Sequence, residues 1–258
     1  MNCCSEKVLG KDNFMKALVL TDVCQFSYMD VPIPKIGPED ILVRVKACAI
    51  CGSDVHGYDG SSGRRIPPVI MGHEASGIIE KVGKSVKKWK SGDRVTFDST
   101  IYCKDCYFCD CGKINLCDNR RVLGVSCSDY KQNGAMAEFV SIPQHILYRL
   151  PDNVTFEQAA MVEPLSVALH AIKNTAVHVN DTVVVIGAGM IGALLIQLLS
   201  LAGCGKIIAV DLEEDRLTMV KNYGADFIIN PKKTDALAEV NNLTHSRGAD
   251  LVFEAVGV

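Results

Sequence analysis

Hydrophobic and polar positions follow two different patterns along the chain. From Met15 to about Pro151, short apolar runs are separated by frequent turn residues, and the stretch ILVRVKA at residues 41–47 alternates between apolar and polar positions. Alternation with a period of two is typical of half-buried strands. Because these strands are short and irregularly spaced, the pattern predicts a small barrel-like β domain.

The pattern changes after Asn153, where Thr155 is a suitable N-cap for a first helix. Strands are then expected at residues 182–187, 206–211, 226–230 and 249–256, with helices at 190–203, 213–223 and 234–245 between them. Successive strand–helix–strand units predict a parallel, doubly wound sheet. A complete dinucleotide-binding sheet has about six strands, so we expect the chain to be truncated at its C-terminal end.

Composition narrows the partners and the compartment. A formal net charge of −3 and a pI near 6.1 argue against nucleic acid or an anionic membrane as a partner. The first residues do not read as a signal peptide, and 12 cysteines in such a chain indicate a reducing, cytoplasmic environment. Residues 1–14 are expected to be a tail. The apolar stretch at residues 182–203 contains glycines and is expected to form a strand, a turn and a helix rather than a membrane span.

The strongest candidate site in the sequence is a cluster of four cysteines: Cys103, Cys106, Cys109 and Cys117. Four thiolates at these short spacings can surround one Zn²⁺ tetrahedrally and leave no open position, as in a structural zinc site. Cys111 lies inside the same loop and competes with Cys109 for one of the four places.

A second candidate metal site combines three ligand types, and its candidate ligands are Cys51, His73, Glu74 and Glu163. A soft sulfur, an imidazole and a carboxylate form the ligand mixture of a catalytic zinc that keeps one position open. Ser53 and His56 follow Cys51 closely and can transfer protons. Asp54 can orient the ring of His73.

The sequence leaves open which glutamate completes this second site. Glu74 directly follows His73, so both can reach one metal only if the backbone turns both side chains inward. Glu163 precedes Pro164, which disfavours helix at Glu163 and predicts a break in the chain at the junction of two domains. We expect Glu163 to lie within reach of the metal, directly or through a water, with Glu74 as its partner or alternate.

A glycine-rich turn with the sequence GAGMIG follows the strand expected at residues 182–187. The candidate cofactor-binding residues are Gly187, Gly189, Met190, Ile191 and Gly192, with Asp211 and Arg216 after the next strand. Glycines at a helix N-terminus let the backbone approach a pyrophosphate, and an acid at the end of the next strand binds the ribose diol. Asp211 would also repel a 2′-phosphate, so the motif predicts NAD rather than NADP.

These signals, in this order, resemble the medium-chain zinc alcohol dehydrogenase family from Met15 to the end of the chain. The resemblance implies an α/β plus β fold, with a GroES-like β-barrel domain at residues 15–160 and a Rossmann domain at residues 161–258. The first domain would hold both zinc ions and the second would bind NAD. Glu163 in place of the family's second cysteine resembles the polyol branch, which includes sorbitol, threonine, butanediol and galactitol-phosphate dehydrogenases.

The resemblance further implies an enzyme that oxidises a secondary alcohol, such as a polyol or sugar alcohol, by transferring a hydride to NAD. Zinc would lower the pKa of the substrate hydroxyl. Ser53 would accept the proton and relay it through the cofactor ribose towards His56 and solvent. The complete protein would act on a small-molecule alcohol as a homodimer or homotetramer.

Three other interpretations compete with this one. A zinc-ribbon interaction module would explain the cysteine cluster, but it gives no reason for Cys51, His73 or the turn at Gly187. A thiol-based redox sensor would use additional cysteines such as Cys111 and Cys127. A zinc-free reductase of the same superfold would lack the cysteine cluster and the GHE triplet at residues 72–74, and this chain has both.

Overall fold

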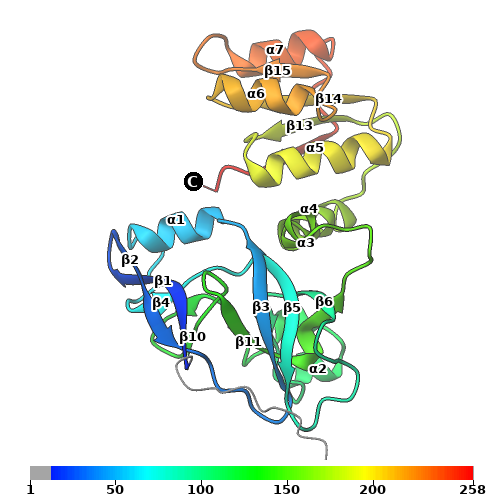
Figure 1. Cartoon of the computed structure of the whole chain (residues 1–258). Coiled ribbons are helices and arrows are strands. Elements are labelled where there is room, and N and C mark those ends of the chain that lie inside the picture. The colour runs from blue at the N-terminus through cyan, green and yellow to red at the C-terminus, as the bar shows by residue number, and fades with distance from the viewer. Residues whose placement is uncertain (1–12, 258) are drawn as a thin grey trace, which may run out of the picture. The chain divides into compact units, whose positions relative to one another are not determined.

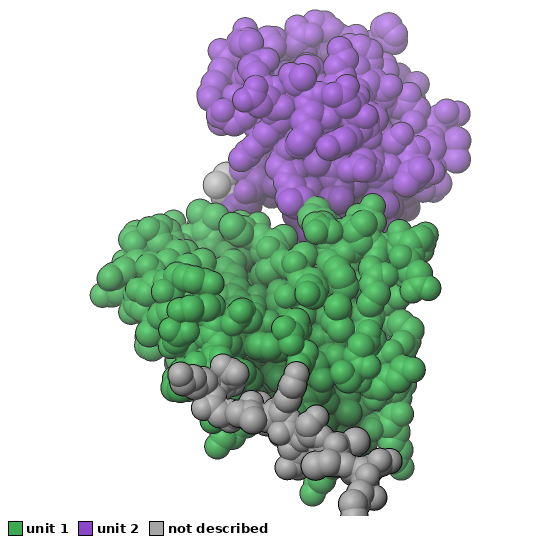
Figure 2. All heavy atoms as spheres, viewed as in Figure 1, with its two compact units in different colours: residues 1–163 green, residues 164–258 purple. Residues whose placement is uncertain are grey.

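The computed structural model describes residues 13–257, and the chain divides into two compact units between Glu163 and Pro164 (Figures 1 and 2). This boundary lies shortly after the one expected at residues 160 and 161. Most of the tail expected at residues 1–14 lies outside the described residues, and Phe14 already begins a strand. Among the described residues, no helix is both long and apolar enough to cross a membrane.

The first unit is built around an antiparallel sheet with the strand order β11-β3-β5-β6-β12. Its strands are β3 (Asp40–Cys48), β5 (Ala75–Val82), β6 (Arg94–Phe97), β11 (Phe139–Pro143) and β12 (Leu147–Arg149). Apolar side chains from these strands pack with Trp89 into the main core of the unit. Cys51 follows β3 of this sheet, and His73 and Glu74 directly precede β5.

The alternation expected along residues 41–47 holds only in part. Ile41, Leu42 and Val43 are all buried, although neighbouring residues of a regular strand face opposite sides. The register of β3 against β5 shifts between Leu42 and Val43. Ile41, Val43 and Val45 still face the main core in alternation, and Leu42 is buried outside that cluster.

Shorter strands complete the first unit. The second sheet has the order β2-β1-β4 and contains β1 (Phe14–Asp22), β2 (Gln25–Pro32) and β4 (Val69–Ile70). Two small antiparallel pairs follow, namely β7 (Thr100–Ile101) with β8 (Arg121–Val122), and β9 (Val125–Ser126) with β10 (Lys131–Gln132). The helical turns between strands are α1 (Gly52–Tyr58), α2 (Tyr107–Asp110), η1 (Ile114–Leu116) and η2 (Gln144–Ile146).

Helix α3 (Phe156–Ala160) lies at the end of the first unit, and the boundary between the units falls within the first turn of α4 (Val162–Lys173). Thr155 caps α3 as expected, since its hydroxyl accepts a hydrogen bond from the backbone N–H of Gln158. The break expected at Glu163 is wrong. The chain leaves the helical path at Met161 instead, and Glu163 and Pro164 both lie in the first turn of α4. Proline is tolerated there because a first-turn residue needs no intrahelical donor.

The second unit is the expected parallel sheet, with the order β15-β14-β13-β16. Its strands are β13 (Thr182–Ile186), β14 (Lys206–Val210), β15 (Phe227–Ile229) and β16 (Leu251–Glu254). The helices between them are α5 (Met190–Ala202), α6 (Glu214–Lys221) and α7 (Ala236–Leu243). The element order therefore agrees with the sequence, while several elements are shorter than expected.

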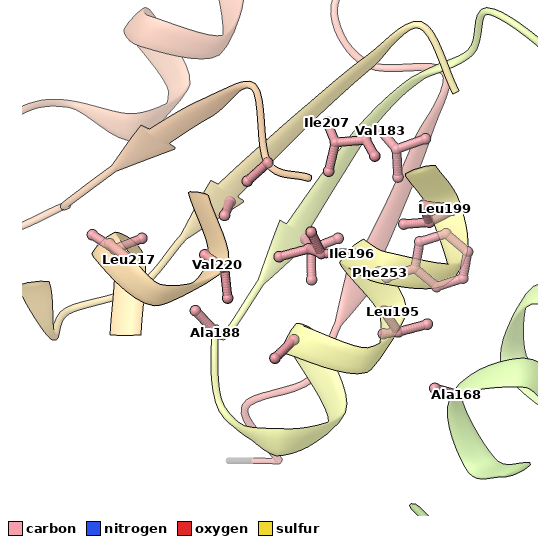
Figure 3. Close-up of a cluster of buried hydrophobic side chains, with 14 residues drawn as sticks. Ala168, Val183, Ala188, Leu195, Ile196, Leu199, Ile207, Leu217, Val220 and Phe253 are labelled. Atoms are coloured by element: carbon pink, nitrogen blue, oxygen red, sulfur yellow. The ribbon is translucent and has the colours of Figure 1, made fainter. Parts of the chain in front are cut away.

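Helices cover both faces of this parallel sheet. Val183 and Val185 of β13 pack against α5 and α6 in the cluster that Figure 3 shows. Val184, between them, faces the other side and packs with residues of α7. Burial on both faces explains why the strand reads as a continuous β-branched run without alternation.

Candidate functional site

The start of helix α1 positions the first group of candidate residues. Cys51 is the N-cap of this helix, and its sulfur accepts a hydrogen bond from the N–H of Ser53 at 3.5 Å. The carboxylate of Asp54 in turn accepts a hydrogen bond from the N–H of Cys51 at 3.0 Å. This reciprocal capping holds both side chains in place, so the CGSD sequence serves as a helix start and as part of a site.

The second group comes from the loop that leads into β5. Gly72 has a φ of +93°, and a Cβ there would lie 2.8 Å from the sulfur of Cys48, so the turn requires glycine. The following residues, His73 and Glu74, are 7% and 2% exposed. Their ligand atoms and the Cys51 sulfur all lie within 4.8 Å of one another. The fold thus brings a thiol, an imidazole and a carboxylate to one point.

Asp54 lies behind the ring of His73. Its Oδ1 is 3.6 Å from His73 Nδ1, which leaves Nε2 as the ring nitrogen that is free for a metal. Burial acts to lower the pKa of His73, but the interactions with Asp54 and Cys51 outweigh it and raise the pKa to about 10. For Asp54, burial acts to raise the pKa, and the interactions with His73 and the N–H of Cys51 lower it overall.

Glu74 is subject to opposing influences. Burial raises the pKa of its carboxyl most strongly, His73 acts to lower it, and the nearby Glu163 carboxylate raises it again. Its Oε2 is among the buried polar atoms that lack a hydrogen-bond partner in the described chain, together with Asp54 Oδ1, His73 Nδ1 and Arg65 Nε. Buried polar atoms normally have partners. A divalent cation between Cys51, His73 and Glu74 would supply one, so these residues fit a zinc ion.

Glu163 lies beside this group, and its Oε1 accepts a hydrogen bond from the hydroxyl of Ser99 at 3.1 Å. It is half-buried in the first turn of α4 and close enough to Glu74 to influence its pKa. The compact group of ligand atoms includes Glu74 rather than Glu163. The structure therefore places Glu74 within the ligand group and Glu163 beside it, a distinction that the sequence had left open.

The candidate proton-transfer residues are both exposed on α1. Ser53 and His56 are three residues apart, a spacing that puts them on the same side of a helix. The ring Nδ1 of His56 lies 3.3 Å from the hydroxyl of Ser61. The Ser53 hydroxyl lies 3.5 Å from Nη2 of Arg65, a residue that sequence reasoning missed.

The four clustered cysteines also converge. The ligand atoms of Cys103, Cys106, Cys109 and Cys117 lie within 4.8 Å of one another. Hydrogen bonds from the backbone of Cys109 and Asp118 lower the pKa of Cys106 to about 7, which favours the thiolate that a metal needs. Cys111, the alternative fifth sulfur, is exposed at the C-cap of α2 and lies outside the group.

The glycine-rich turn lies between β13 and α5 in the second unit. Gly187 has a φ of +97°, and Gly189 is the N-cap of α5. A Cβ on Gly192 would approach the carbonyl oxygen of Gly187 to 1.8 Å, so only glycine allows this helix to pack so close to the turn. Met190 and Ile191 form the first turn of α5, whose N-terminal N–H groups make an anion-binding position.

Asp211 follows β14 and is held by two backbone groups. Its Oδ2 accepts a hydrogen bond from the N–H of Ala188 at 2.7 Å, and its Oδ1 accepts one from Glu213 at 2.9 Å. Arg216 of α6 lies 3.9 Å away with its Nη1. The acid and the glycine turn are therefore connected within one unit, as the dinucleotide-binding motif requires.

Comparison with known proteins places this arrangement in a family. Residues 37–152 match the alcohol dehydrogenase GroES-like domain, and residues 191–258 match the zinc-binding dehydrogenase domain. A probable D-xylulose reductase A from Aspergillus fumigatus is 39% identical over 249 residues, which cover 93% of this chain and 68% of that protein. The chain belongs to the zinc-binding alcohol dehydrogenase family. The expected GroES-like and Rossmann folds and the expected enzyme class are confirmed.

Further relatives of this dehydrogenase are also named as alcohol, polyol or zinc-binding dehydrogenases. The sorbitol dehydrogenase of Bacillus subtilis is 36% identical, with 94% of this chain and 69% of that protein covered. A zinc-binding dehydrogenase structure from Sinorhizobium meliloti 1021, bound to NADP, has a TM-score of 0.86 and 34% identity, with coverage of 95% and 70%. A short chain alcohol dehydrogenase from Escherichia coli CFT073, complexed with NADH, has a TM-score of 0.85 and 32% identity, with the same coverage.

Proposed function

We propose that this dehydrogenase oxidises a secondary hydroxyl of a small polyol or sugar alcohol, with NAD as the hydride acceptor. The observation that carries the proposal is the group formed by the half-buried Cys51 with the buried His73 and Glu74, whose ligand atoms lie within 4.8 Å of one another. Relatives that are named for D-xylulose and sorbitol support a polyol as the substrate class.

Each residue of the site has a distinct role in this proposal. Cys51, His73 and Glu74 would hold a zinc ion, which makes a bound hydroxyl acidic near neutral pH. Asp54 orients His73 through Nδ1, 3.6 Å away. Glu163, held by Ser99, adds a second carboxylate beside Glu74 and opposes excess positive charge at the metal.

Ser53 and His56 are proposed to move the proton. As the substrate loses its hydroxyl proton, the Ser53 oxygen accepts it and its own hydrogen passes on towards His56 and solvent. Both residues lie on the exposed side of α1, so the released proton has a route to water. NAD, when bound, would supply the hydride acceptor, so that the products would be a ketone, NADH and one proton.

The cysteine cluster is proposed to hold a second, structural zinc ion. Four thiolates fill a tetrahedral coordination shell and leave no position for substrate. Cys117 is 2% exposed, so this site lies within the fold of its loop. Its role is to stabilise the segment between β7 and β8 rather than to take part in turnover.

NAD is proposed as the preferred cofactor because Asp211 would bind a ribose diol and repel a 2′-phosphate. Two observations favour NADP instead. An arginine near the position of Arg216 can accommodate a 2′-phosphate, and one structural neighbour is bound to NADP. The carboxylate decides in favour of NAD because two backbone hydrogen bonds fix it, whereas the arginine side chain is 57% exposed.

For the complete protein we propose a homodimer or homotetramer in the cytoplasm, with a small alcohol as its partner. The proposed activity is tested by following NADH formation with a panel of polyols, including xylitol and sorbitol. Because the chain covers 68% of the xylulose reductase, the complete gene product is used. We expect turnover with at least one polyol and loss of turnover after zinc removal. Activity that survives complete zinc removal, or no activity with any polyol, would refute the proposal.

A further inference from the structure

Arg65 is a buried arginine next to the candidate active site. Its side chain is 6% exposed, whereas its neighbour Arg64 is exposed. Arginine is almost never buried unless its charge is paired. The groups that surround Arg65 therefore indicate why this position holds a guanidinium.

The guanidinium faces two residues of the site. Its Nη2 lies 3.7 Å from Oδ1 of Asp54 and 3.5 Å from the hydroxyl oxygen of Ser53. The same Oδ1 lies 3.6 Å from Nδ1 of His73. One carboxylate oxygen is thus placed between a candidate metal ligand and the arginine. Nη1 donates to the carbonyl of Arg64 at 3.2 Å, which limits how the guanidinium can turn.

The surrounding fold is arranged to hold Arg65 there. Its backbone forms a bridge to Ser126, with hydrogen bonds from Ile66 to Ser126 at 2.9 Å and from Ser126 to Arg64 at 3.1 Å. Gly57 of α1 provides the space for the side chain, since a Cβ at Gly57 would lie 2.2 Å from Cγ of Arg65. Glycine is unfavourable inside a helix, so its presence at this contact is consistent with a need to admit the arginine.

We propose that Arg65 is a positioning residue that sets both the metal ligand and the proton acceptor of the reaction. This inference rests on the proposed function and extends it. Through Asp54 it acts on His73, because the arginine balances a buried carboxylate that would otherwise turn away from the ring. Through Ser53 it acts on the substrate proton, because a donor at one lone pair of the hydroxyl oxygen directs the hydrogen away and leaves the other lone pair to accept.

The test uses the complete gene product and three variants. Arg65→Met keeps most of the side-chain volume and removes the charge and the donors. Arg65→Lys keeps one charge but lacks the fork that reaches two partners. Arg64→Met is the matched control, because it removes an exposed arginine at the adjacent position. The measurements are zinc release to a chelator, kcat and KM with the best polyol, and the solvent isotope effect on kcat.

Arg65→Met is expected to weaken zinc retention at the Cys51 site about 10- to 100-fold, as loss of an outer partner of a ligand does. With zinc added back to saturation, kcat should remain about tenfold below wild type, with KM changed less than about threefold and a larger solvent isotope effect. Arg65→Lys should retain zinc nearly as wild type does and still show the reduced kcat. Arg64→Met should match wild type in every measurement.

Two further variants separate positioning from folding. Gly57→Ala displaces the arginine without removing any polar group and should reproduce the zinc release and kcat of Arg65→Met. On a Ser53→Ala background, with zinc at saturation so that the effect through His73 is removed, Arg65→Met should lower kcat no further, because residues that act through one another are not additive. A full additional loss of kcat on that background would overturn the part of the proposal that concerns Ser53.

Zinc retention and turnover of Arg65→Met equal to those of Arg64→Met would overturn the whole proposal. If Arg65→Met does not fold, as circular dichroism would show, Arg65→Lys decides: wild-type kcat overturns the proposal, and reduced kcat with retained zinc supports it. Chelator release requires no turnover. It therefore still tests the link from Arg65 to His73 if the wild-type protein oxidises no polyol, a result that would refute the proposed function alone.

Discussion

Asp211 is the residue from which we infer the preference for NAD. Both of its oxygens accept backbone hydrogen bonds, at 2.7 and 2.9 Å, and its side chain is 8% exposed. The carboxylate is therefore already oriented before any cofactor binds. A fixed negative charge favours a ribose diol and disfavours a 2′-phosphate.

Asp211→Ala should accordingly narrow the preference for NAD over NADP. Loss of a charge-assisted hydrogen bond costs about 1.5–3 kcal/mol, so the ratio of the two kcat/KM values should fall roughly tenfold or more. Asp215→Ala, at an exposed position in the first turn of α6, is the control and should leave the ratio unchanged. A wild-type enzyme that prefers NADP would show that the role of Asp211 has been misassigned.

Glu163 should matter more for turnover than for folding. It is half-buried, accepts a hydrogen bond from the Ser99 hydroxyl at 3.1 Å, and raises the pKa of Glu74. Glu163→Ala is therefore expected to lower kcat about 10- to 100-fold, as loss of a partner beside a metal ligand does, with little change in Tm. Glu157→Ala, an exposed change on α3, should alter neither value. Full activity of Glu163→Ala would contradict the role proposed for this carboxylate beside the metal.

Residue types and their spacing were enough to select the ligand candidates, because few residues offer thiolate, imidazole or carboxylate ligands. They could not show whether Glu74 or Glu163 lies closer to Cys51 and His73, because that depends on how the loop before β5 turns. Arg65 was missed for a related reason. The sequence RR before two prolines gives no signal of burial, and the space for the arginine comes from Gly57 on another segment.

At the scale of elements, each of the two candidate metal sites includes the cysteine at the start of a different short helix. The sulfur of Cys51 caps α1 beside His73 and Glu74, whereas Cys106 stands at the N-cap position of α2, in the cysteine cluster, without a capping hydrogen bond from its side chain. Cys106→Ser should mainly lower the free energy of unfolding, because a structural zinc contributes directly to folding. Cys51→Ser should mainly abolish turnover. Denaturant unfolding and kcat, measured on both variants, test this, and the reverse outcome would mean that the two sites have been exchanged.

Strand β12 is tied to the turn before β6 by one ion pair. Arg149 donates to both oxygens of Asp93, at 2.8 and 3.0 Å, and its guanidinium lies 5.0 Å from the ring centroid of Trp89. Asp93 is 7% exposed, and the hydrogen bonds from Arg149 lower the pKa of its carboxyl. Trp89 is the single tryptophan of the chain, so its fluorescence reports on this contact.

Arg149→Met should lower the free energy of unfolding by about 1 kcal/mol, since Asp93 loses two hydrogen bonds from a guanidinium that is itself half-exposed to water and keeps the one from the N–H of Lys90. Because the pKa of Asp93 is depressed in the folded state, this stabilisation is present above the unfolded pKa of about 3.9 and is lost as pH falls through the lower folded value. The difference from wild type should therefore be constant from pH 8 to about 5.5 and shrink below about 4.

Urea unfolding followed by Trp89 fluorescence measures that difference, with the exposed Arg121→Met as the control. A difference that grows as the solution is acidified would contradict the assigned role of Asp93.

The elements of the second unit could be predicted because the parallel strands are short, mainly apolar runs, and β13 ends at the glycine-rich turn. The helix expected at residues 234–245 is shorter because Asp235 caps it and it ends at Leu243. The strands β7 to β10 each have two residues, too few to show any period. The helical position of Glu163 was missed because proline is compatible with a first turn, which the pattern cannot distinguish from a break.

At the scale of the whole molecule, the order of the motifs identified the family, and the family confirmed the two folds. What the sequence could not give were the contacts between segments far apart in the chain. Asp54 and His73 meet because α1 and the loop before β5 converge, and Arg65 joins them from a third segment. We propose that these segments converge around a catalytic zinc ion.

Zinc content, measured by elemental analysis of carefully reduced protein, tests that claim most directly. The two ligand groups predict two zinc ions per chain in the wild type. Cys51→Ser should retain one, in the cysteine cluster, because loss of the thiolate removes a ligand from the other group only. A wild type with a single zinc, or a Cys51→Ser variant that still holds two, would contradict the catalytic zinc site on which the proposed function rests.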